Sequence, residues 1–141
     1  MAQIPAFLLG LTRRQGEHQV PGFRFPRSHV QITDYRGTLV MSLQRDCIVL
    51  AKALDNYVCL WYKDGSSDFK SIVFRQKMQE LAKVICSDDI VRCHRSYIVN
   101  LEYVKIIRPY RKSYRMDIGL PGVDYVPVSA AFISKFAENG K

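Results

Sequence analysis

The 141-residue chain has few cysteines, and none is placed to bind a metal. The four cysteines stand at positions 47, 59, 86 and 93 without any CxxC spacing, and HxxxH is also absent. Structural zinc sites use closely spaced pairs of this kind, so we expect no metal site. Cys47, Cys59 and Cys86 lie in apolar runs, which indicates reduced, buried thiols of a cytoplasmic protein.

The motifs of common enzyme classes are absent as well. The sequence contains no GxSxG, HExxH, Walker-type loop or GxGxxG. Cys93 and His94 are adjacent, so on a strand their side chains point to opposite faces and cannot pair as nucleophile and base. Asp88 and Asp89 are typical of a turn rather than of an acid–base pair. We therefore expect neither catalysis nor a cofactor.

The N-terminal apolar stretch, residues 6–11, is too short to span a bilayer. Positive charges follow it rather than precede it, which is the wrong order for a secretory signal. We expect a packing segment or loose arm here, with the clipped end of a membrane helix as the alternative. Residues 1–28 show no hydrophobic period, and we interpret them as a basic arm or linker before a folded domain at 29–141. The arm carries Arg13, Arg14, Arg24 and Arg27 among its prolines.

Acidic residues are scarce. Against 21 Lys and Arg stand 13 Asp and Glu, which gives a net charge of +8 and a pI near 9.5. Six of these net charges fall within residues 92–115, where four tyrosines are interleaved. The seven cations are Arg92, Arg95, Lys105, Arg108, Arg111, Lys112 and Arg115, against Glu102 alone. Guanidinium and ammonium groups neutralise phosphates, so this strip favours nucleic acid; a solvated basic face is the alternative.

Alternating apolar and polar residues predict a mainly β domain. We expect two strands about a turn at Gly37, followed by strands at 46–53, 57–62, 69–74, 90–93, 97–99, 103–107, 114–118 and 125–128. An apolar stripe predicts a helix over 74–85, and Ser129 is placed to cap a closing helix at 130–136. Core positions are expected at Tyr97, Ile98, Val99, Val104 and Ile106. Asn100 is expected to satisfy backbone groups at a strand end.

The run VRCHRSYIVNLEYV at 91–104 resembles the signature of the LytTR DNA-binding domains of bacterial transcription regulators. Residues 53–58 before a hairpin, the helix at 74–85 and the closing stretch 126–129 agree with that family in order and spacing. The resemblance covers roughly residues 30–136. It implies an elongated arrangement of small antiparallel β-sheets with one or two short α-helices, and not a helix-turn-helix.

The resemblance also implies loops that contact successive major grooves on one side of bent DNA. The family's base-contacting positions match Asn56, Arg95 and Ala131. Asn56 is then expected to pair with adenine and Arg95 with guanine, whereas Ala131 offers only a methyl group where a basic residue is common. Expected contacts to the DNA backbone are His94, Ser96, Arg111, Lys112, Arg115, Ser129 and Lys135.

These expectations amount to sequence-specific binding of double-stranded DNA by all or part of a bacterial transcription regulator, such as the output domain of a two-component response regulator. Such domains typically bind paired direct repeats as dimers. Residues 1–28 are too short for a receiver, so the chain is either a stand-alone regulator or a fragment of one with an upstream sensor, receiver or membrane module. The second hypothesis is a non-catalytic interaction domain whose basic strip binds a protein partner, RNA or anionic lipid.

Cys93 resembles a position associated with redox sensitivity in some members of the family. Arg92 and His94 flank it and would lower the pKa of an exposed thiol. We expect instead a buried, inert thiol.

Overall fold

The computed structural model describes residues 29–65 and 68–133. The arm expected at 1–28 and the end of the closing helix lie outside this part of the chain. The elements are β1 (His29–Thr33), β2 (Leu39–Gln44), η1 (Arg45–Cys47), β3 (Ile48–Leu54), β4 (Tyr57–Lys63), β5 (Phe69–Arg75), α2 (Met78–Ile85), β6 (Ile90–His94), β7 (Tyr97–Asn100), η2 (Leu101–Tyr103), β8 (Ile106–Tyr110), β9 (Ser113–Asp117) and β10 (Val126–Val128).

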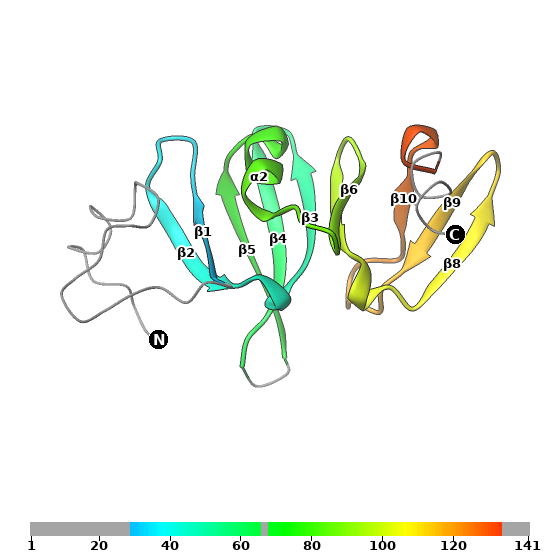
Figure 1. Ribbon diagram of the computed structural model, residues 1–141, viewed down its shortest axis with the longest axis horizontal. Coiled ribbons are helices and arrows are strands. Elements are labelled where there is room, and N and C mark those ends of the chain that lie inside the picture. Colours follow the sequence, from blue (N-terminus) through cyan, green and yellow to red (C-terminus); the bar gives the residue numbers. More distant parts are fainter. Residues whose placement is uncertain (1–28, 66–67, 134–141) are drawn as a thin grey trace.

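Three antiparallel sheets stand side by side along the long axis of the molecule (Figure 1). The central sheet has the order β5-β4-β3-β7-β6, the hairpin β1-β2 flanks it on one side, and the sheet β10-β9-β8 flanks it on the other. This elongated, mainly β arrangement confirms the expected fold class. Among the described residues, no helix is both long and apolar enough to cross a membrane.

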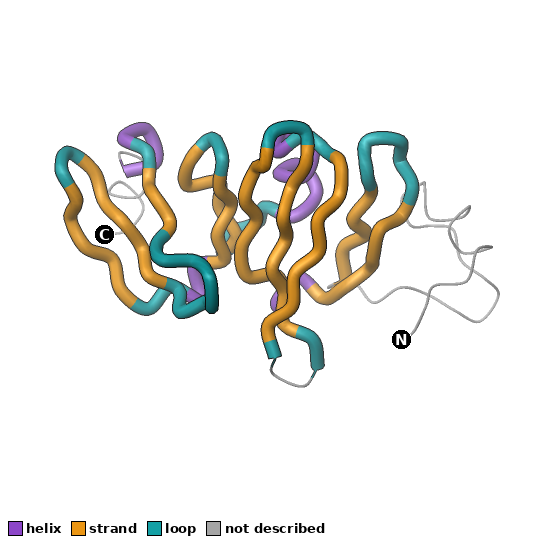
Figure 2. The backbone as a smooth tube through the Cα atoms, turned by 180° about the vertical axis from the view of Figure 1, so that it is seen from behind, coloured by secondary structure: helices purple, strands orange, loops and turns teal. Residues whose placement is uncertain are grey.

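The central sheet separates two hydrophobic cores, because strands β3 and β7 bury residues on both of their faces. Ala51 and Ile98 face the first core, which also contains the apolar sides of α2 and of β1. Val99 and Cys93 face the second core, formed with the three-stranded sheet. Figure 2 shows the helix behind the central strands and the third sheet beside them. Strands β3 and β7 therefore pack both faces against apolar cores instead of leaving one face to solvent.

A bulge in β3 allows the strand to pack against both cores. The pairing of β3 with β4 shifts register between Ile48 and Leu50. Val49 and Leu50 consequently both belong to the second core, whereas Ile48 and Ala51 belong to the first. An extra residue of this kind re-aims the side chains that follow it.

The helix begins later than the hydrophobic period predicted. It starts at Met78, because β5 continues to Arg75, which pairs with Tyr57 in β4. Phe74 is buried as a strand residue opposite Val58. Phe74 and Met78 both face the first core, so their four-residue spacing fits a helix although only Met78 is helical.

Other expectations were wrong at the margins of the cores. Ile106 is 48% exposed rather than buried, because β8 is the outermost strand of its sheet. Tyr103 lies in the short helix η2, so the strand expected at 103–107 begins instead at Ile106. Cys47 and Cys86 are only half-buried, whereas Cys59 is buried as expected, and all are free thiols.

Asn100 joins the central sheet to η2, as expected from the sequence. Its side chain is 3% exposed. The Nδ2 group donates to the carbonyl oxygen of Ile48 at 2.8 Å, and Oδ1 accepts from the amide of Glu102 at 2.9 Å. One buried side chain thus satisfies two backbone groups where β3 begins and β7 ends.

We expect Asn100→Ala to lower the free energy of unfolding by about 1–3 kcal/mol, because it leaves buried backbone groups without partners. Urea denaturation measures this loss. The matched control is Asn56→Ala, which removes the same side chain from an exposed turn and should change stability by less than about 0.5 kcal/mol. Equal losses in the two variants would contradict the structural role of Asn100.

Candidate nucleic-acid interface

Several turns and strand ends lie along one edge of the molecule, the upper edge in Figure 1. We call this the loop edge. It consists of the turns at 34–37, 55–56, 95–96 and 111–112, the residues 75–77 that connect β5 to α2, and the residues 129–131 that follow β10. The loop edge brings together segments from all three sheets.

Backbone hydrogen bonds between neighbouring segments hold the loop edge together. Each of four bonds links two segments that are distant in sequence, and none belongs to a strand ladder. The four amide-to-carbonyl bonds are Tyr35 to Arg75 at 2.8 Å, Gln76 to Asn56 at 3.2 Å, Ala53 to Ser96 at 2.9 Å and Ser129 to Cys93 at 2.8 Å. The Ser113 hydroxyl also donates to the carbonyl oxygen of Val128. The relative positions of the segments are therefore set by the backbone.

Arg95 occupies the turn between β6 and β7. Its side chain is exposed and makes no hydrogen bond or ion pair within the described residues. Its carbonyl oxygen accepts a 2.7 Å hydrogen bond from the Arg92 guanidinium. Arg92 thus steadies the turn while the guanidinium of Arg95 stays available for a ligand.

His94 and Ser96 flank Arg95 and are half-buried. The amide of Ser96 donates to His94 Nδ1 at 3.1 Å, so the neutral imidazole carries its proton on Nε2. Burial and then the neighbouring charge of Arg95 lower the pKa of His94. The imidazole is accordingly neutral at pH 7 and offers an Nε2–H donor.

Asn56 lies in the β3–β4 turn, which aims it away from both cores. The preceding residue, Asp55, has φ 61°, a left-handed conformation that is common in two-residue hairpin turns. The side chain of Asn56 is exposed and makes no hydrogen bond within the described residues. Asn56 and Arg95 therefore present free polar groups from adjacent turns.

Ser129 and Ala131 lie where the last strand meets the closing helix. The Ser129 hydroxyl accepts a 3.3 Å hydrogen bond from the amide of Phe132, which makes it the N-cap that the sequence predicted. Ala131 is exposed on the first turn of that helix. Lys135 lies outside the described residues.

The remaining cations from the sequence analysis differ in their surroundings. Arg111 and Lys112 form the exposed β8–β9 turn, with Arg111 at φ 56°. Arg115 lies within β9, half-buried, and its guanidinium stands 4.1 Å from the ring centroids of both Tyr110 and Tyr125. Arg111 and Lys112 project from the loop edge, whereas Arg115 is packed between two aromatic rings.

Three cations on the loop edge were not singled out by the sequence. Arg36 lies in the β1–β2 turn, Arg75 ends β5, and Lys77 directly precedes α2; all three are exposed. These residues fall outside the charged strip at 92–115. The β4–β5 pairing and the Gln76–Asn56 hydrogen bond bring Arg75 and Lys77 near Asn56, and the Tyr35–Arg75 hydrogen bond places the β1–β2 turn beside them.

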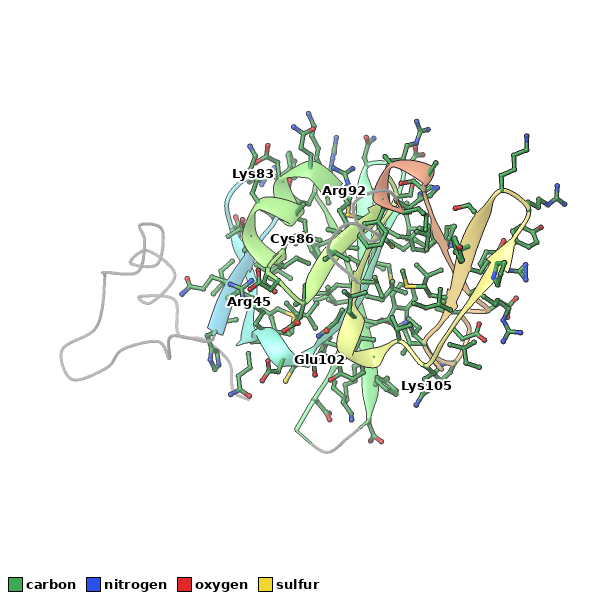
Figure 3. All side chains as sticks on the ribbon, turned by 45° about the vertical axis from the view of Figure 1, so that its right-hand side comes forward. Arg45, Lys83, Cys86, Arg92, Glu102 and Lys105 are labelled. Atoms are coloured by element: carbon green, nitrogen blue, oxygen red, sulfur yellow. The ribbon has the colours of Figure 1, made fainter. Side chains whose placement is uncertain are left out.

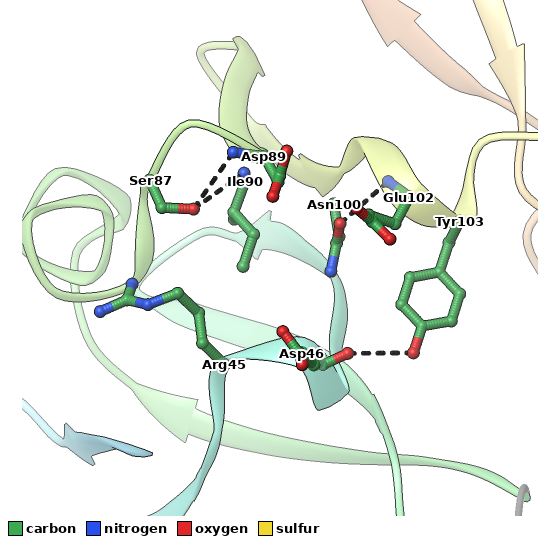
Figure 4. Close-up of a pocket in the computed structure, with 8 residues that line it drawn as sticks. All are labelled: Arg45, Asp46, Ser87, Asp89, Ile90, Asn100, Glu102 and Tyr103. Carbon is green, nitrogen blue, oxygen red and sulfur yellow. Dashed lines mark hydrogen bonds between the residues drawn. The ribbon is translucent and has the colours of Figure 1, made fainter. Parts of the chain in front are cut away.

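The opposite ends of β3 and β7 carry the opposite charge. A cleft of about 340 Å³ lies there beside η1 and η2, lined by three carboxylates, those of Asp46, Asp89 and Glu102 (Figure 4). Arg45, its one lysine or arginine, donates to the carbonyl oxygen of Ile85 at 2.8 Å. Figure 3 shows Arg92 toward the loop edge and Glu102 toward the cleft. This polarity favours a polyanion at the loop edge rather than at the cleft.

Cys93 lies beneath the loop edge and is fully buried. Its sulfur is 3.6 Å from the carbonyl oxygen of Pro127 and 3.9 Å from that of Tyr97. Burial raises the pKa of the thiol to about 12, despite the cationic neighbours in sequence. The thiol is therefore protonated at neutral pH, as expected for an inert core cysteine.

Comparisons with known proteins identify the family and the fold. The family model of the LytTr DNA-binding domain matches residues 39–141. A similar solved structure is the LytTr DNA-binding domain of a Bacillus cereus protein described as a methyl-accepting/DNA response regulator. The structural match has a TM-score of 0.59 and a sequence identity of 21%, and it covers 80% of this chain and 96% of the solved chain. No curated protein matches. The family model spans most of the length of this chain. The chain therefore belongs to the LytTR family of DNA-binding domains, which act in transcription regulation.

Proposed function

We propose that residues 29–141 bind double-stranded DNA sequence-specifically through the loop edge. The observation that carries this proposal is the position of Asn56 and Arg95 on adjacent turns, exposed and without partners within the described residues. The major groove presents a distinct pattern of donors and acceptors for each base pair. Free amide and guanidinium groups at the tips of rigid turns are suited to that pattern.

Each base-contacting residue has a role set by its chemistry. The fork of Arg95 matches the O6 and N7 acceptors of guanine, and the amide of Asn56 matches N6 and N7 of adenine. Ala131 provides a methyl contact to thymine. Because these residues come from three successive segments, the domain would contact successive major grooves along one side of bent DNA.

Contacts to phosphate would set the position of the domain on the duplex. His94 would donate from Nε2, and Ser96 from its hydroxyl. The Ser129 hydroxyl accepts from the helix amide, which leaves its own proton for a phosphate oxygen. Arg111 and Lys112 would extend this contact from the β8–β9 turn, with Arg115 and Lys135 as further cations.

The two ends of the loop edge differ, since one ends in the β1–β2 turn and the other in the β8–β9 turn. Two copies bound in the same orientation along a duplex would therefore recognise direct repeats rather than a palindrome. We propose that the target is a pair of direct repeats, occupied by a homodimer or by two monomers in tandem.

The proposed function is tested by selecting binding sites from random duplex DNA with the purified chain. We expect enrichment of a short repeated motif. The logarithm of affinity for that motif should fall with the logarithm of salt at a slope of roughly −4 to −6, as five or six neutralised phosphates require. The absence of any retention of duplex at low salt would overturn the proposal and favour a protein, RNA or lipid partner.

We expect Arg95→Ala to remove discrimination at one base pair of the selected site. In the wild type, replacing the contacted guanine should cost about 1–3 kcal/mol, and in the variant that cost should vanish. Binding measurements on the original and substituted sites give the coupling energy. Lys112→Ala is the control, because loss of a phosphate contact should weaken binding to both sites equally. Discrimination that persists in Arg95→Ala would contradict base contact by this residue.

We expect His94 to make the free energy of unfolding fall as pH drops below about 6.5. Its pKa is lowered in the folded state, so the unfolded chain binds a proton there at higher pH. This stability is complete above the unfolded pKa and is lost as pH falls through the folded one. Urea denaturation from pH 7.5 to 5 should show a smaller decrease in His94→Gln than in the wild type. Identical pH profiles would contradict the neutral, half-buried imidazole.

A further inference from the structure

Three side chains form a cluster at the end of the loop edge nearest to β1 and β2. We call Tyr35, Arg36 and Arg75 the Tyr35 cluster. The Arg75 guanidinium carbon stands 4.6 Å from the centroid of the Tyr35 ring, and that of Arg36 stands 5.6 Å away. Arg36 Nε also donates to the Tyr35 hydroxyl oxygen at 3.2 Å. One tyrosine thus holds two guanidinium groups, although its ring remains 51% exposed.

The backbone beneath the Tyr35 cluster is held in place from both sides. The Tyr35 amide donates to the carbonyl oxygen of Arg75 at 2.8 Å, and Gln76 Nε2 donates to that of Thr33 at 3.0 Å. Asp34 closes the turn, because its Oδ1 accepts from the amides of Arg36 and Thr38 at 2.9 and 3.0 Å. The two guanidinium groups are therefore positioned before any ligand arrives, which lowers the entropic cost of binding one.

No carboxylate forms an ion pair with either arginine among the described residues. By contrast, Lys70, Lys83 and Arg108 each pair with an acidic side chain, at 3.2, 3.3 and 2.9 Å. A guanidinium stacked on an aromatic ring keeps its N–H donors in its own plane, and those other than Arg36 Nε are free to match phosphate oxygens. Within residues 29–65 and 68–133, the Tyr35 cluster thus presents two guanidinium groups that form no ion pair, while the nearby Asp34 carboxylate is hydrogen-bonded to amides of the turn.

The position of the Tyr35 cluster favours one kind of anion as its ligand. The amide of Gln76, next to Arg75, donates to the carbonyl oxygen of Asn56, so the cluster directly adjoins the β3–β4 turn. A duplex contacted by Asn56 would continue past this end of the loop edge. The group that it presents at regular spacing along its surface is the phosphodiester.

We propose that Tyr35, Arg36 and Arg75 bind the phosphodiester backbone of DNA that flanks the base pairs contacted by Asn56. The guanidinium groups neutralise two phosphates, and the Tyr35 hydroxyl, which accepts from Arg36, donates its proton to a phosphate oxygen. This contact extends the DNA footprint beyond the three base-contacting segments toward the β1–β2 hairpin. It rests on the proposed function and adds affinity without adding sequence information.

The test uses the full chain and the duplex enriched by selection. We expect Arg36→Ala and Arg75→Ala each to make the salt slope about 0.9 less steep, and the double variant about 1.8. Each of these variants should weaken binding to the selected site and to its base-substituted forms by the same factor. Hydroxyl-radical footprinting of the double variant should lose protection at one flank only. Tyr35→Phe keeps the stacked arrangement and should cause a smaller loss of affinity.

Lys70→Ala is the matched control. It also removes one exposed positive charge, at the end of β5 opposite to Arg75, and should leave slope and footprint unchanged. Thermal unfolding of all variants should match that of the wild type, since the substituted side chains are exposed.

The outcomes separate the two proposals. Specific binding by the wild type, with Arg36→Ala and Arg75→Ala indistinguishable from Lys70→Ala, would overturn the phosphate contact and leave the proposed function standing. Failure of the wild type to enrich any duplex would overturn the proposed function and this contact with it.

Discussion

The burial of both faces of strand β3 constrains the rest of the structure. Ile48, Val49, Leu50 and Ala51 are all fully buried, although they face two different cores. A slip of one residue would exchange the side chains of the two cores, so the register of β3 against β4 and β7 is strongly determined. The turn at 55–56 therefore has a defined position, and the Ala53–Ser96 hydrogen bond ties the neighbouring turn to it.

Rigid strands explain how short turns can present functional groups accurately. Asp55 and Arg111 adopt left-handed backbone conformations at the first positions of two-residue turns, which the flanking ladders impose. The conformational cost at these positions is offset by the packing below them. The same strands separate charge, because their upper ends carry free cations and their lower ends carry the carboxylates of the cleft. Under the proposed function, fold and electrostatics both favour a polyanion at the loop edge.

Local patterns in the sequence predicted much of the fold. Alternation located the strands, Ser129 marked the cap of the closing helix, and Asn100 was recognised as a residue that satisfies the backbone. The start of α2 was misplaced because Phe74 is buried whether it belongs to a strand or to a helix. Ile106 was expected in a core, yet it is exposed on the outermost strand of its sheet.

The sequence alone determined the family signature at 91–104, the mainly β character and the excess of positive charge, because each of these is carried by residue identity and short-range spacing. Only the tertiary structure decided which charges act together. Arg36 and Arg75 meet on one tyrosine ring, whereas Arg115 is enclosed by two rings within its own sheet. The physical reason is that periodicity reports whether a residue is buried but not what lies beside it. Neighbours on the loop edge are set by sheet order and by hydrogen bonds between distant turns.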